Sequence, residues 1–169
     1  IAQLGLVVYL SARAARLAPA TAGTLFLAYS ALTGVTFSLI LLAYTGASVA
    51  NAFFITAGMF GALAVYGSVT KRDLTGMGRF MFMGLVGLVI ASVVGIFWQN
   101  DAMQFVMGVV GVLVFSGLIA YDTQRLRAMA LEVSGEQAGS YAIVGALSLY
   151  LDFINLFISL LRLFGDRRN

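Results

Sequence analysis

The sequence predicts an all-α protein, a polytopic membrane helix bundle in which a central last helix is wrapped by the others. Three observations support this prediction. Hydrophobic residues make up 61% of the 169 residues and charged residues only 10%, against about 25% charged in soluble domains. Five apolar runs are each about 20 residues long, enough to cross about 30 Å of hydrocarbon as helices. The third observation is a polar stripe along the last of these runs.

The first element in chain order is residues 1–12, which we interpret as the end of a helix whose beginning is missing. The chain starts IAQLGLVVYL without a Met. This apolar stretch is too short for a complete span, and it lacks the basic start and cleavage site of a signal peptide. Five complete spans follow, and we assign everything to a single membrane domain, 1–169. The spans are 21–43, 50–69, 79–98, 103–124 and 140–164.

Basic residues alternate between the breaks that separate the spans. The second and fourth breaks have none, whereas the first, third and fifth contain Arg13, Arg16, Lys71, Arg72, Arg79, Arg125 and Arg127. By the positive-inside rule, the basic breaks face the cytoplasm. A last helix that enters from the cytoplasm should end outside, yet the tail is also basic. Either the rule fails at the tail or the last segment is re-entrant.

The last span carries its polar residues on one side. Gly145, Ser148, Asp152, Asn155, Ser159 and Arg162 are spaced by three and four residues alternately, which puts them on one helix face. A carboxylate in the middle of a span costs about 2.5–3.5 kcal/mol on insertion scales. This face should therefore look into protein or water, which makes the last helix central. We expect positions 148 and 155 to be shielded from the lipid and Phe153 or Phe157, on the other faces, to be reached from it.

The stripe has a structural and a functional interpretation. Asp152 is either a hydrogen-bonding residue satisfied by a neighbouring helix or a functional acid. Ser148, Asn155 and Ser159 either join helices through hydrogen bonds or line a pathway. Arg162 is expected to extend to the membrane interface.

A partner for Asp152 is sought among the few other charges, and Asp122 in "GLIAYDTQRLRAMALE" is the candidate. Two carboxylates at hydrogen-bonding distance cannot both ionise easily, so one keeps its proton and the pair titrates as a unit. The alternative is that Asp122 is a solvated helix-end residue next to Arg125. The chain has no His and no Cys, which excludes thiolate nucleophiles and the usual zinc sites and leaves proton chemistry near neutral pH to carboxylates.

Several stretches resemble the transmembrane Bax inhibitor motif family in its bacterial branch. They are "YSALTGVTFS", "TAGMFGALAVYG", "TKRDLTGMG", "AYDTQRL" and above all "LSLYLDFINLFISLLRLFG". The resemblance implies helices wrapped around a central last helix in the bacterial cytoplasmic (inner) membrane. It also implies a pH-sensitive calcium leak channel, with Ca²⁺ as the transported ion and no tightly bound cofactor.

The resemblance assigns roles to particular residues. It places the pH sensor and gate on Asp122 of "AYD" and Asp152 of "YLDF", with both carboxylates as Ca²⁺ ligands. Arg16, or alternatively Arg13, matches a basic residue that pairs with these acids. Where some members carry a Glu in the second helix, the nearest residue here is Gln3.

Two other functions stay open. One is a membrane regulator that binds a partner protein, such as a membrane protease or a cell-death factor. The other is an intramembrane aspartyl protease, since Tyr121-Asp122 mimics one motif of such enzymes. Asp152, however, follows Tyr-Leu and not Gly-x-Gly, so we expect no enzyme. The net charge of +3 is explained by loop arginines, so no nucleic-acid partner is expected.

Overall fold

Five long helices make up the computed structural model, which describes residues 9, 12–13, 16–98 and 100–167. They are α2 (Pro19–Leu42), α3 (Gly46–Val69), α4 (Thr75–Phe97), α5 (Asp101–Glu132) and α6 (Glu136–Phe164). Each is long and apolar enough to cross a membrane. The all-α membrane fold is therefore confirmed. The expected helix fragment 1–12, with Gln3, lies outside the described residues apart from Tyr9 and Ala12.

The helix ends follow local rules of capping. Pro19 opens α2, where its missing N–H is not needed. The side chains of Thr45 and Asn100 accept hydrogen bonds from the first turns of α3 and α5. The helix α5 continues well past the predicted end at residue 124, because "RLRAMALE" contains no Gly or Pro to stop it. The chain reverses next to Gly135, whose φ of 79° suits glycine.

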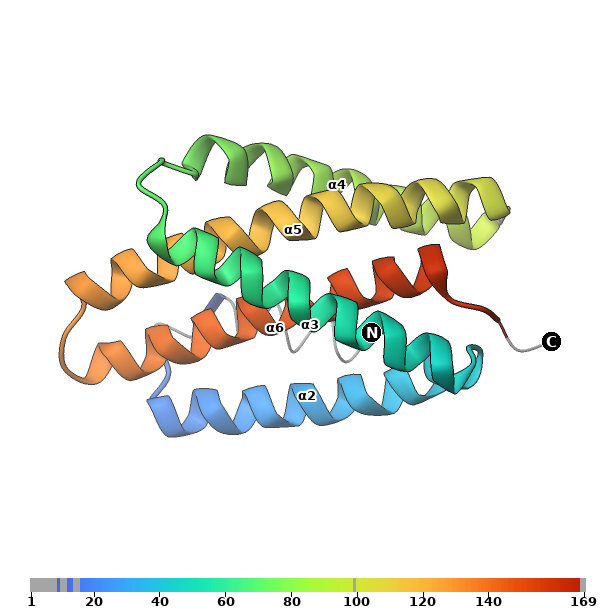
Figure 1. The fold of residues 1–169 in the computed structure, drawn as a ribbon. Helices are drawn as coiled ribbons and strands as arrows, with labels where there is room; N and C mark the ends of the chain where they lie inside the picture. Colours follow the sequence, from blue (N-terminus) through green and yellow to red (C-terminus); the bar gives the residue numbers. More distant parts are fainter. Residues whose placement is uncertain (1–8, 10–11, 14–15, 99, 168–169) are drawn as a thin grey trace.

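Four helices lie side by side in the order α4, α5, α6 and α2, and α3 crosses in front of α5 and α6 (Figure 1). The closest packing is between α5 and α6, and α3 packs on both of them. The helix α4 packs mainly on α5, and α2 mainly on α6. The expectation of one central last helix wrapped by all the others is not confirmed, because α5 and α6 occupy the centre together.

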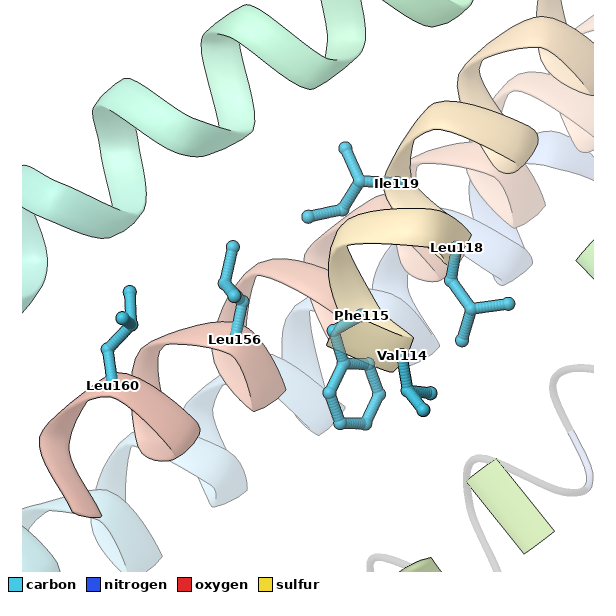
Figure 2. Packing of buried hydrophobic residues seen from close by; sticks show 6 residues of the cluster. All are labelled: Val114, Phe115, Leu118, Ile119, Leu156 and Leu160. Carbon is cyan, nitrogen blue, oxygen red and sulfur yellow. The ribbon is translucent and has the colours of Figure 1, made fainter. Parts of the chain in front are cut away.

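The core lies along the seam between α5 and α6 (Figure 2). Its buried side chains are Val114, Phe115, Leu118, Ile119, Leu156 and Leu160. Residues of α3 and α4 close over this cluster, among them Phe60 and Leu85. Within a bilayer such contacts stabilise through close van der Waals packing.

Of the two aromatic residues of α6 that the sequence suggested would be reached from the lipid, Phe157 is buried and Phe153 is half-buried. Phe157 is 6% exposed and packs with Tyr44 and Ala52. The ring of Phe153 makes edge contacts with Phe53 and Phe60 of α3. The expectation was wrong for Phe157, because α3 and the loop before it cover this side chain.

The chain segment after α6 is held against the loop between α2 and α3. The Thr45 amide donates to the Asp166 carbonyl at 3.0 Å, and the Asp166 amide donates to Ser48 Oγ at 2.9 Å. That loop carries no basic residue, so we call its side of the membrane the outer side. The helix α6 is continuous over 29 residues and ends there, so it crosses completely and is not re-entrant. The positive-inside rule fails at the tail.

Candidate functional site

The antiparallel packing of α5 and α6 brings Asp122 and Asp152 together. Their carboxyl groups are within hydrogen-bonding contact, and each acts on the other. Asp152 is 6% exposed and Asp122 is half-buried. The contact between these two acids, expected from the sequence, is present in the fold.

The pair needs a proton to be satisfied. Asp152 Oδ2 is buried and has no hydrogen-bond donor among the described residues. An ionised carboxylate only accepts hydrogen bonds, so two ionised groups in contact have nothing to share and repel each other. With one proton between them, one carboxyl donates to the other in a charge-assisted hydrogen bond. A hydrogen bond between the two carboxyl groups therefore requires a proton on one of them.

The cation whose charge acts on Asp122 is Arg125, one helical turn further along α5. Arg16 is exposed just before α2. Arg16 is not among the described groups that act electrostatically on either aspartate. The pairing of Arg16 with the acids therefore stays a prediction.

A small cavity lies on the cytoplasmic side of the pair. It has a volume of about 40 Å³, enough for a few water molecules. Asp122, Arg125, Tyr141 and Ser148 supply its polar lining. Tyr141 was missed from the sequence, although it lies four residues before Gly145 and so continues the stripe by one turn.

A larger cavity, of about 270 Å³, lies on the outer side of the pair between α4, α5 and α6. Ser92, Asn155, Ser159 and Arg162 line it together with apolar residues. The two cavities have no lining residue in common. Asp152 lies between Ser148 and Asn155 on α6, so the stripe runs from one cavity to the other and the acid pair lies between the two cavities.

The outer cavity presents oxygen atoms to whatever enters it. Asn155 Nδ2 donates to the Leu151 carbonyl at 2.8 Å, and Ser159 Oγ donates to the Asn155 carbonyl at 2.7 Å. Because these donors are used within α6, the Asn155 Oδ1 and the lone pairs of Ser159 Oγ stay available. Such oxygens are ligands for hard cations.

The acid pair is too sparse for a tight metal site. The part of the chain that the structure describes holds no group of three or more His, Cys, Asp or Glu side chains able to hold an ion. Ca²⁺ prefers six to eight oxygen ligands. The pair with its neighbouring oxygens therefore suits brief contact with a passing cation better than storage.

A comparison with protein families identifies the family of this chain. The model of the family Bax1-I, described as "Inhibitor of apoptosis-promoting Bax1", matches residues 1–169. The chain belongs to the Bax1-I family. This confirms the resemblance seen in the sequence.

Bacterial relatives support the assignment to Bax1-I. The inner membrane protein YbhL of Escherichia coli K12 is 50% identical over 171 residues, which cover 99% of this chain and 73% of YbhL. An uncharacterized protein of Deinococcus radiodurans is 51% identical over 168 residues, covering 99% of this chain and 73% of that protein. The protein RP147 of Rickettsia prowazekii is 44% identical over 169 residues, covering 99% and 72%. The Bax1-I chain is thus a multi-pass protein of the bacterial inner membrane.

Proposed function

We propose that this Bax1-I protein is a pH-sensitive leak path for Ca²⁺ across the inner membrane, gated by Asp122 and Asp152. One observation carries the proposal: a buried acid pair lies on a polar stripe, between the two cavities that the stripe joins. A carboxylate in a membrane span is costly and is usually functional. Here its position is the place where a path would have to open.

The gate follows from the charges of the pair. One shared proton ties α5 to α6 by a charge-assisted hydrogen bond. Loss of that proton leaves two negative charges in contact, and gain of a second proton removes the charge that strengthens the bond. Either change weakens the tie and lets a separated state become populated. An ionised and separated pair then offers two carboxylates to Ca²⁺, with Ser148 and Asn155 before and after it.

The alternative functions have less support from the site. A peptide strand does not fit a cavity of about 40 Å³ beside Asp122, which disfavours an aspartyl protease. A regulator that binds a partner protein would use outward faces such as that of α4, where Phe80, Phe82 and Phe97 are exposed. Lipid covers such residues equally well, so nothing in that surface favours a protein partner.

Purified protein in liposomes tests the proposal. Ca²⁺ flux is measured against pH for the wild type, Asp152→Asn and Asp101→Asn. Asp101 is the exposed first residue of α5, remote from the pair, and is the matched control. We expect a pH-dependent flux in the wild type and the control, and a flattened profile in Asp152→Asn. Absence of Ca²⁺ flux in the wild type, or an unchanged profile in Asp152→Asn, would overturn the proposal.

A further inference from the structure

We infer that Arg162 is an electrostatic barrier at the outer mouth of the Ca²⁺ path and keeps the leak slow. The inference rests on the proposed leak function and adds a residue that sets its rate and its ion preference. It is carried by the place of Arg162 in the outer cavity and by the charges around it.

Arg162 lies at the outer end of that cavity. It is in the last turn of α6 and exposed, and it lines the cavity with Ile96 and Met107, which lie near the outer ends of α4 and α5. The inner end of the lining is formed by Phe115 and Asn155, toward the acid pair. A cation that enters from outside therefore passes the guanidinium before it reaches Asp152.

Within the part of the chain that the structure describes, no carboxylate is among the groups that act on Arg162. The side chains that act on it electrostatically are Tyr44 and Arg167, neither of which is a carboxylate. Among the lining residues of the outer cavity, Arg162 is the charged one, and the other polar groups are Ser92, Asn155 and Ser159. The cavity thus combines oxygen atoms that favour a cation with one fixed positive charge at its entrance.

Such a barrier has a signature that distinguishes it from a steric plug. Coulomb repulsion is proportional to the charge of the ion, so the energy barrier is twice as high for Ca²⁺ as for K⁺. The factor by which the barrier slows Ca²⁺ is therefore the square of the factor for K⁺. A guanidinium within several ångströms of the path, in water and physiological salt, slows a divalent cation by roughly two- to tenfold. A steric plug would slow both ions by similar factors.

The experiment compares Ca²⁺ and K⁺ flux in liposomes for the wild type, Arg162→Gln, Arg162→Lys and Arg167→Gln. Arg162→Lys keeps the charge, and Arg167→Gln removes a charge on the same side that does not line the cavity. We expect Arg162→Gln to raise Ca²⁺ flux about two- to tenfold and K⁺ flux by only about the square root of that factor. Arg162→Lys should match the wild type, and Arg167→Gln should have a smaller effect. The pH profile should keep its shape in all variants, because the acid pair is untouched.

The possible failures are distinguishable. If the wild type conducts Ca²⁺ and Arg162→Gln does not change this flux, the barrier role of Arg162 is overturned and the leak function is not. Equal increases for Ca²⁺ and K⁺ would also overturn it, since they would show a widened path and not a lowered charge barrier. A wild type without Ca²⁺ flux would overturn the leak function itself and the barrier with it.

Discussion

At the scale of single residues, the candidate site was found in the sequence because a carboxylate in a membrane span has a high free energy of insertion. Asp152 stood out because a carboxylate in an apolar run needs a reason, and Asp122 was the acid that could reach it. Their contact in the fold follows from the α5–α6 pairing. Tyr141 was not anticipated, since its place beside Asp122 depends on which faces of the two helices meet. Sequence spacing places residues on a face but does not say what lies opposite.

Glycine positions give a test of close helix packing at this scale. A Cβ at Gly67 of α3 would collide with the Ala120 carbonyl of α5, whereas a Cβ at Gly58 of the same helix meets nothing within 4 Å. We expect Gly67→Ala to lower the free energy of unfolding by about 1–3 kcal/mol, because backbone cannot move aside as a side chain can. Gly58→Ala should be neutral or slightly stabilising. Unfolding in detergent measures both, and equal stability of the two variants would contradict the α3–α5 packing.

At the scale of elements, the five spans were predictable because length and hydropathy alone define a membrane helix. The ends of the helices were harder to predict from the sequence. The extension of α5 to Glu132 depends on continued helix-forming residues beyond the apolar run, and hydropathy does not register these. The central position of α5 beside α6 was also missed. The stripe on α6 indicated that α6 is surrounded by other helices, but it did not indicate which second helix lies at the centre.

The start of α4 is held by a carboxylate outside the membrane span. Asp73 accepts hydrogen bonds from the Thr75 hydroxyl at 2.6 Å and the Thr75 amide at 2.9 Å. These bonds lower the pKa of Asp73 below its ordinary 3.8. A lowered carboxyl pKa means that this support is present above pH 3.8 and is lost as the pH falls through the lower, folded-state pKa.

Hydrogen exchange of the first turn of α4 measures that support. We expect Asp73→Ala to reduce protection of this turn at pH 7 relative to the wild type. The difference should shrink as the pH falls well below 3.8, once rates are corrected for intrinsic exchange. Asp101→Ala, at the start of α5, should leave α4 unchanged. A difference between Asp73→Ala and wild type that is the same at every pH would contradict a role for the charged carboxylate.

At the scale of the whole molecule, the side of the chain end could not be predicted from charge counting. The tail is basic, yet a hydrogen bond between residues 118 apart holds Asp166 beside Ser48 on the outer side. Contacts of this range are set by the fold and are not visible in local composition.

Single cysteines test this topology without background, because the chain has none of its own. We expect Arg167→Cys to react with an impermeant maleimide added outside spheroplasts. Lys71→Cys, in the loop between α3 and α4, should react only in inside-out vesicles. Labelling of both positions from the same side would mean that α6 does not cross completely.

The central claim is that Asp122 and Asp152 act as one proton-sensitive unit, and a double-variant comparison tests it most directly. Ca²⁺ flux in liposomes is measured against pH for Asp122→Asn, Asp152→Asn and the variant with both changes. Residues that act as a unit give non-additive effects. We expect each single change to flatten the pH profile nearly as much as both together. Two partial effects that simply add, or a profile that keeps its full pH dependence in either single variant, would contradict the claim.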